Sequence, residues 1–218
     1  MVYPVARFIV PKILGIWIRS VEGLGNVPMD RPFIIAVNHA SYIDAVLMHC
    51  IIIPKINKNI HAFVNSNYWK NPFTRIIVDW GCSIPVFLGK DKDAKQKNNA
   101  AFDRAIEFIN KGGIIQIFPE GRRSRDGKLQ RAYNGIARLA LESGIDVLPC
   151  AIIGSHNVLP KGKFFPRFAR CRVKIGKPMS FKKYLAKKNA KNTDIILQDI
   201  TRSIMKEIAK LIGQEYNF

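Results

Sequence analysis

Two short segments of the sequence carry side chains that could do chemistry together. The first holds Asn38, His39 and Asp44 in an N-H-x-x-x-x-D arrangement. A histidine is an effective general base when a carboxylate orients its ring and stabilises the imidazolium. The second segment, residues 118–124, reads Phe-Pro-Glu-Gly-Arg-Arg-Ser, and its guanidinium groups suit phosphate oxygens. Together the segments predict an enzyme that activates a hydroxyl group on a phosphorylated acceptor.

Asp44 also has a purely structural interpretation. Ser41 and Asp44 are spaced as in a capping box at the start of a predicted helix, with Ser41 as the N-cap. Capping the helix and orienting His39 are compatible roles, so the spacing leaves both open.

Both segments directly follow a predicted buried strand. Residues 33–37 precede the histidine segment, and residues 114–118 lead into the Pro-Glu-Gly turn. Ligand sites of α/β proteins gather at the carboxyl ends of strands. We therefore expect the polar groups of both segments to lie at the same rim of one sheet.

Strands alternate with helices along the rest of the chain. This alternation predicts a single layered α/β domain with a mostly parallel mixed sheet flanked by helices. Pro85 places its strand at an edge, and Pro54 is expected to end the first helix. The other predicted strands are 60–64, 83–87, 147–153 and 172–175, and the predicted helices are 43–53, a helix ending at Gly112–Gly113, 134–143 and a C-terminal helix capped by Thr193.

The formal charge of +19 indicates an anionic partner, either nucleic acid or a membrane with acidic lipids. Between Asp146 and Asp194 the chain has no acidic residue but twelve Lys and Arg. No zinc-finger or aromatic RNA-binding signature is visible, so no nucleic acid is expected. An anionic membrane surface is the favoured partner.

The cysteine and histidine spacing does not predict a metal site. Cys50, Cys82, Cys150 and Cys171 form no C-x-x-C pair, and no two histidines are three to five residues apart. Their apolar neighbours favour buried, reduced thiols, although two disulfides remain compatible with the sequence.

The N-terminal residues 1–20 predict an amphipathic, membrane-associating helix. The stretch is too short and too interrupted by Arg7, Pro11 and Lys12 to span a bilayer, and no convincing signal-peptide cleavage site follows. Packing of this helix on the protein's own core is an equally good interpretation. Its expected apolar face consists of Phe8, Ile9, Ile13, Ile16 and Trp17.

The ordered motifs resemble those of lysophospholipid acyltransferases of the 1-acylglycerol-3-phosphate acyltransferase type. Residues 38–44 are similar to the family's N-H-x-x-x-x-D block, and residues 118–124 to its F-P-E-G-T-R-S block. Residues 147–149 are similar to its V-x-P block. The resemblance covers roughly residues 20–180.

Two positions depart from the family pattern. Arg122 stands where the family usually has Thr, and the Arg usually found shortly after residues 84–86 is missing. Lys90 or Arg122 could take over the phosphate contact of that missing Arg.

The resemblance implies transfer of a fatty acyl group from acyl-CoA or acyl-carrier protein to lysophosphatidic acid, making phosphatidic acid for phospholipid biosynthesis. His39 would be the general base and Asp44 its orienting partner, with no metal or other cofactor. The expected domains are residues 1–20, the interfacial helix, and 21–218, the acyltransferase domain, acting at the cytoplasmic face of a membrane. The implied substrate-binding residues are Asn38, Glu120, Gly121, Arg122, Arg123 and Ser124.

Other functions stay open. Glycerol 3-phosphate or another lysophospholipid could be the acceptor. A basic protein that binds lipid or nucleic acid without catalysis is the non-enzymatic alternative.

Overall fold

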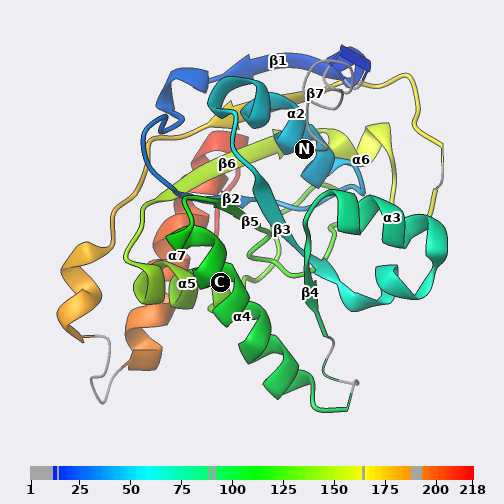
Figure 1. Ribbon diagram of the computed structural model, residues 1–218. Helices are drawn as coiled ribbons and strands as arrows, with labels where there is room; N and C mark the ends of the chain where they lie inside the picture. The colour runs from blue at the N-terminus through cyan, green and yellow to red at the C-terminus, as the bar shows by residue number, and fades with distance from the viewer. Residues whose placement is uncertain (1–11, 14, 88, 90–91, 164, 188–192) are drawn as a thin grey trace.

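A seven-stranded mixed sheet forms the centre of the computed structural model (Figure 1). The structure describes residues 12–13, 15–87, 89, 92–163, 165–187 and 193–218. Along the sheet the strand order is β1-β7-β6-β2-β5-β3-β4. Among these strands β6 and β7 pair antiparallel, and the other neighbours pair in parallel. The predicted mostly parallel mixed sheet is therefore confirmed.

The helices and strands follow in chain order, with η denoting 3₁₀ helices. They are η1 (Gly15–Trp17), β1 (Ile18–Glu22), η2 (Leu24–Asn26), β2 (Ile34–Val37), α2 (Asp44–Ile56), β3 (Ile60–Asn65), η3 (Ser66–Lys70), α3 (Pro72–Trp80), β4 (Ile84–Val86), α4 (Ala94–Asn110), β5 (Ile114–Ile117), α5 (Gly135–Ser143), β6 (Val147–Ile153), α6 (Ser155–Val158), β7 (Cys171–Ile175), η4 (Lys182–Lys187) and α7 (Thr193–Ile212).

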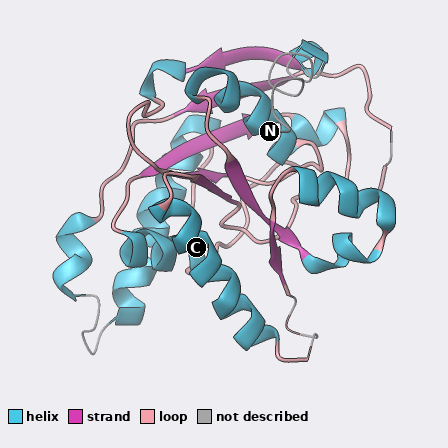
Figure 2. Cartoon of the chain, viewed as in Figure 1, coloured by secondary structure: helices cyan, strands magenta, loops and turns pink. Residues whose placement is uncertain are grey.

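Helices cover both faces of the sheet, as Figure 2 shows. Successive residues of a strand point to opposite faces, so β2 contributes to two hydrophobic layers. Ile34 packs with α4, α5 and α7 on one face, while Ile35 packs with α2 on the other. A strand buried on both faces must be apolar throughout, which explains the Ile-Ile-Ala-Val sequence of β2.

The first predicted helix extends further than expected. Pro54 lies inside α2, in its last turn, instead of ending it; its fixed φ is in the helical range, although its missing N–H costs the helix one hydrogen bond. The helix ends at Asn57, whose left-handed φ of 52° lets its N–H donate to the carbonyl of Ile53.

Edge strand β4 confirms the placement expected from Pro85. Several elements were not predicted, among them a strand and a nine-residue helix. One is β1, which pairs with β7 and takes up residues 18–20 of the range expected to be helical. The other is α3, which begins after Asn71, whose side-chain oxygen accepts the N–H groups of Phe73 and Thr74. The rest of the N-terminal helix prediction falls mostly outside the described residues. Within those residues, no helix is long and apolar enough to cross a bilayer.

Candidate active site

The two sequence segments meet because β2 and β5 are neighbours in the sheet. Ile34 pairs with Ile115 and Ala36 with Ile117, so the parallel strands end side by side. His39 follows the end of β2, and Glu120 follows the end of β5. The expected meeting of both segments at one rim of the sheet is confirmed.

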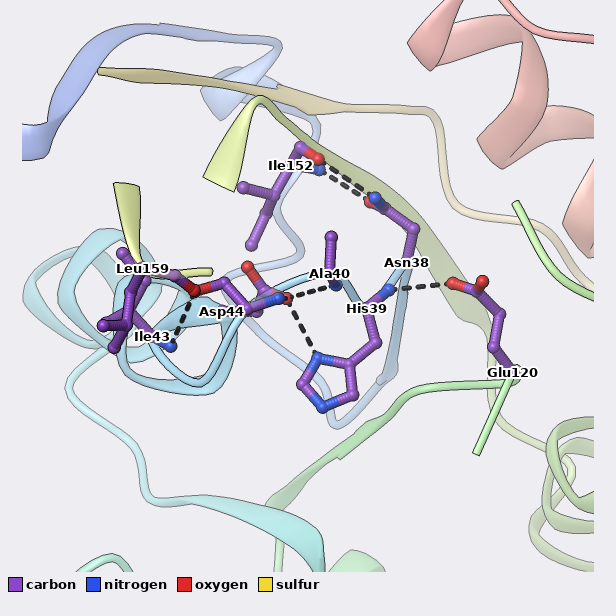
Figure 3. A network of polar contacts seen from close by, with 9 residues as sticks. Asn38, His39, Ala40, Ile43, Asp44, Glu120, Ile152 and Leu159 are labelled. Atoms are coloured by element: carbon purple, nitrogen blue, oxygen red, sulfur yellow. Dashed lines mark hydrogen bonds and ion pairs between the residues drawn. The ribbon is translucent and has the colours of Figure 1, made fainter. Parts of the chain in front are cut away.

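His39 and Asp44 form a hydrogen-bonded pair (Figure 3). Nδ1 of His39 lies 2.9 Å from Oδ2 of Asp44. That oxygen also accepts the backbone N–H groups of Ala40 and Ser41, each at 2.7 Å. An ionised carboxylate only accepts, so Nδ1 carries the proton and Nε2 keeps its lone pair. The imidazole is thus held in the tautomer that a general base needs.

The pair differs from the expected capping box in one respect. The N-cap of α2 is Ile43 rather than Ser41, whose hydroxyl donates to the carbonyl of Leu159 at 2.8 Å. Asp44 still accepts the N–H of Ser41, which is the reciprocal half of a capping box. Asp44 therefore orders the segment before α2 and orients His39 at once.

The two residues of this pair differ in how deeply they are buried. The Asp44 side chain is fully buried, whereas the His39 side chain is 19% exposed. The imidazole stacks on the ring of Phe118, with centroids 3.9 Å apart and an interplanar angle of 19°. Asp44 and Phe118 thus fix the position of the His39 ring, and part of the side chain remains exposed to solvent.

The turn after β5 holds the backbone of His39 at both of its polar groups. Oε1 of Glu120 accepts the His39 N–H at 2.8 Å, and the His39 carbonyl accepts the N–H of Ser124 at 2.8 Å. The second oxygen of Glu120 accepts the N–H of Gln130, also at 2.8 Å. Glu120 is thus a brace between the histidine segment and the loop that follows the turn.

Burial raises the pKa of Glu120 to about 7 from its ordinary 4.5, against the two backbone N–H groups and Arg122, which favour the ionised form. The carboxyl group is only 1% exposed, so water does not solvate its charge. Glu120 therefore titrates near neutrality.

The turn requires glycine next to Glu120. Gly121 has a left-handed φ of 63°, and a Cβ there would approach ring carbons of Tyr133 to 3.1 Å. Its N–H donates to the carbonyl of Phe118, and the Tyr133 N–H donates to the carbonyl of Pro119. These constraints fix the turn in which Glu120 is buried and the neighbouring Arg122 is exposed.

Arg123 is the best-placed cation of the site. Its guanidinium lies 3.4 Å from the ring centroid of Tyr42, which stands three residues after the base. Nη1 of Arg123 is buried and has no hydrogen-bond partner among the described residues. Among these residues the donor lacks a partner, and an anionic oxygen is the kind of acceptor that a guanidinium prefers. Arg122 is exposed, and Lys90, the other candidate phosphate contact, lies outside the described residues.

The remaining candidates hold the site together. Asn38 is buried; its amide donates to the carbonyl of Ile152 and accepts the N–H of the same residue, which ties β2 to β6 (Figure 3). The hydroxyl of Ser124 donates to Asp126. Asn38, Glu120 and Ser124 thus position the site, whereas Arg122 and Arg123 are available for contact with substrate.

Residues at the far end of the chain fasten the loop after the turn. The side chain of Gln214 accepts the N–H of Leu129 and donates to the carbonyl of Gly127. The hydroxyl of Tyr216 accepts the N–H of Ala132 at 2.9 Å. These bonds flank Gln130 and so support the second hydrogen bond of Glu120.

Sequence reasoning missed these supporting roles. Tyr42 lies inside the histidine block, where an aromatic ring near an arginine-rich turn was an available signal. Gln214 and Tyr216 carry no such local signal, because only the fold brings them to the loop.

The four cysteines are free, and three of them are buried, as expected for reduced thiols. In the described part of the chain, no three His, Cys, Asp or Glu residues cluster closely enough to hold a metal ion.

The fold and site define a class of α/β protein in which a carboxylate-oriented histidine lies on a segment bonded to a cationic turn. More particularly, the chain belongs to the family described as Acyltransferase, whose model matches residues 18–153, more than half of the sequence.

Individual relatives agree with this assignment. The chain is 26% identical over 162 residues to the chloroplastic 1-acyl-sn-glycerol-3-phosphate acyltransferase LPAT1 of Arabidopsis thaliana, covering 73% of this chain and 43% of that protein. It is 24% identical over 157 residues to a 1-acyl-sn-glycerol-3-phosphate acyltransferase of Borreliella burgdorferi, covering 70% and 59%. The chain thus spans about half the length of these relatives.

A solved structure supports the fold. The crystal structure of the 1-acyl-sn-glycerophosphate (LPA) acyltransferase PlsC from Thermotoga maritima superposes with a TM-score of 0.63 at 23% identity. The match covers 94% of this chain and 82% of that one.

Proposed function

We propose that this protein transfers a fatty acyl group from an acyl thioester to the free hydroxyl of lysophosphatidic acid, making phosphatidic acid. The observation that carries the proposal is the imidazole of His39, oriented by Asp44 at 2.9 Å, on a segment whose Tyr42 ring carries the guanidinium of Arg123. A base and an anion-binding donor on adjacent segments match an acceptor that carries both a hydroxyl and a phosphate. The relatives that are 1-acyl-sn-glycerol-3-phosphate acyltransferases support this acceptor.

The reaction begins with proton transfer to Nε2 of His39. As the acceptor hydroxyl loses its proton, its oxygen attacks the thioester carbonyl and forms a tetrahedral intermediate. Asp44 stabilises the imidazolium by its negative charge. The C–S bond then breaks, the imidazolium returns the proton to the thiolate, and an ester and a free thiol result. These steps balance without a metal or redox cofactor.

Arg123, assisted by Arg122, binds the acceptor phosphate in this proposal. Binding of the phosphate at the turn brings the acceptor hydroxyl toward His39. This positioning reduces the entropy that must be lost in the transition state. The guanidinium of Arg123 is already oriented by Tyr42, which lowers the entropy lost on binding.

The donor is acyl-CoA or acyl-carrier protein, and the acceptor is taken from an anionic membrane at its cytoplasmic face. The net charge of +19 favours binding of either donor and of the membrane, because CoA phosphates, an acidic carrier protein and acidic lipids are all anions.

An acyl-transfer assay tests the proposal. Lysophosphatidate, glycerol 3-phosphate and a zwitterionic lysolipid are each offered with acyl-CoA and with acyl-carrier protein, and thiol release and product are measured. We expect the highest rate with lysophosphatidate and a loss of at least roughly 100-fold in His39→Ala. His156→Ala, a histidine outside the site, is the control. A full rate in His39→Ala, or transfer only to another acceptor, would contradict the proposal.

A further inference from the structure

Helix α3 turns an apolar stripe toward solvent. Phe73, Ile76, Ile77 and Trp80 follow the i, i+3, i+4, i+7 spacing of one helix face, and their exposed fractions range from 41% to 79%. The buried residue of the helix is Val78. Amphipathic helices of soluble proteins normally turn such a stripe to the core, and a large exposed apolar patch marks an interaction site.

A second exposed apolar segment lies between α6 and β7. Phe165 and Phe168 are both exposed there. The loop also exposes Lys161, Lys163 and Arg167 and contains no acidic residue. In Figure 1 this loop and α3 both reach the right-hand edge of the molecule. Aromatic side chains among cations suit the boundary between acyl chains and anionic headgroups.

The segments that precede both elements lie near the histidine segment. Tyr68, in η3 four residues before α3, has a phenol whose pKa is raised by burial and by the nearby Tyr42, and Arg123 lies over the ring of Tyr42. Leu159, two residues before the loop, accepts the hydroxyl of Ser41 with its carbonyl. The chain therefore leads from the surroundings of His39 into both apolar elements.

We propose that the stripe of α3 and the described part of the loop, residues 161–163 and 165–170, together dock the protein on the surface of an anionic lipid bilayer. The six apolar side chains enter the headgroup boundary, and the cations of the loop pair with lipid phosphates. At nine residues, α3 is about 14 Å long, so it lies along the interface rather than across it. The role of this docking rests on the proposed function. Docking would bring Arg123 and His39 to a lysophosphatidic acid acceptor while the acyl chain of the acceptor stays in the leaflet.

Charge argues for a lipid surface over a second copy of the chain. Two copies meeting through the loop would bring its cations against each other, whereas an acidic leaflet neutralises them. The docking face therefore fits an anionic partner better than itself.

Vesicle co-sedimentation of the full chain tests the docking face. The probes are phosphatidylcholine vesicles with and without phosphatidylglycerol, and the variants are Ile76→Ser with Ile77→Ser, and Phe165→Ser with Phe168→Ser. We expect each double variant to bind the anionic vesicles at least roughly tenfold more weakly. The matched control is Ile195→Ser, because Ile195 is 57% exposed on α7 and lies outside the docking face.

A second measurement separates docking from catalysis. Acyl transfer is followed with lysophosphatidate in vesicles and with a short-chain, water-soluble lysophosphatidate. We expect the docking variants to lose activity on vesicles and to keep it on the soluble acceptor. Unchanged vesicle binding in both variants overturns the docking face, and so does a patch variant that changes only the oligomeric state in lipid-free solution. If the unaltered chain acylates neither acceptor, the proposed function fails, while the binding experiment still decides the docking face.

Discussion

Glu120 accepts the backbone N–H of His39 at 2.8 Å across 81 residues of sequence. The carboxylate therefore fixes the main chain of the base, while Asp44 fixes its ring. Family resemblance implies that Glu120 contributes to substrate binding, which stays a prediction; the structure adds that each of its oxygens accepts a backbone N–H group. Its structural role explains why a buried carboxyl group follows the strand directly.

Replacing Asp44 by Asn tests the orientation of the base. The neutral amide cannot stabilise an imidazolium, and its single oxygen must serve three donors that now share Oδ2. We expect kcat to fall by at least roughly 100-fold with little change in KM. Steady-state kinetics measure both constants. Asp103→Asn, a change on the exposed face of α4, is the control and should retain full activity.

The titration of Glu120 predicts a pH-dependent stability. Its pKa in the folded protein is about 7, above the ordinary 4.5 of the unfolded chain. Below pH 4.5 the Glu120 carboxyl group is protonated in both the folded and the unfolded protein. Between pH 4.5 and 7 the unfolded protein has lost this proton while the folded protein still holds it. The contribution of Glu120 to the free energy of unfolding therefore declines as the pH rises through this window. The decline amounts to roughly 3 kcal/mol.

Denaturant unfolding of the parent and of Glu120→Gln between pH 4.5 and 7.5 measures this dependence. The variant should lose the decline, whereas Glu107→Gln, at an exposed site on α4, should keep it. Parallel pH profiles for the parent and Glu120→Gln would show that Glu120 titrates at its ordinary pKa.

Arg123→Lys tests the phosphate contact. Lysine keeps the charge but loses the planar fork and its stacking on Tyr42. We expect KM for lysophosphatidate to rise roughly tenfold or more, because a charge-assisted hydrogen bond contributes about 1.5–3 kcal/mol. Arg125→Lys, an exposed change in the same loop, is the matched control. Arg122→Lys, measured beside them, tests whether Arg122 rather than Lys90 takes over the phosphate contact of the family's missing Arg.

The fastening of the loop by Gln214 predicts a remote effect on the site. In Gln214→Ala the N–H of Leu129 and the carbonyl of Gly127 lose their partner. We expect a stability loss of about 1–2 kcal/mol and a several-fold lower kcat/KM, because the bond from Gln130 to Glu120 loosens. Hydrogen exchange at the Leu129 amide should accelerate. Asn217→Ala changes an exposed amide in the same tail and should leave this exchange rate unchanged.

Local patterns in the sequence predicted the strands that carry the site and the meeting of its two segments. Apolar runs such as Ile34–Val37 followed at once by polar motifs specify both a buried strand and its functional end. The pairing of His39 with Asp44 also followed from spacing, because five residues separate them across the start of one helix.

Other features depend on contacts that no local pattern encodes. Helix α3 has a clear start signal in Asn71-Pro72, yet its apolar stripe faces outward, against the usual rule for a folded domain. The fastening by Gln214 and Tyr216 joins positions more than eighty residues apart. The pKa of Glu120 depends on its depth of burial, which the sequence does not give.

The main chain of His39 is bonded on both sides by residues from the turn after β5. A nascent or proteolytically clipped chain that lacks this turn has the histidine and the aspartate but no scaffold to align them. Bringing together two groups 81 residues apart costs chain entropy that a locally formed helix does not offset. The proposed base is therefore aligned only in a chain whose tertiary structure is complete.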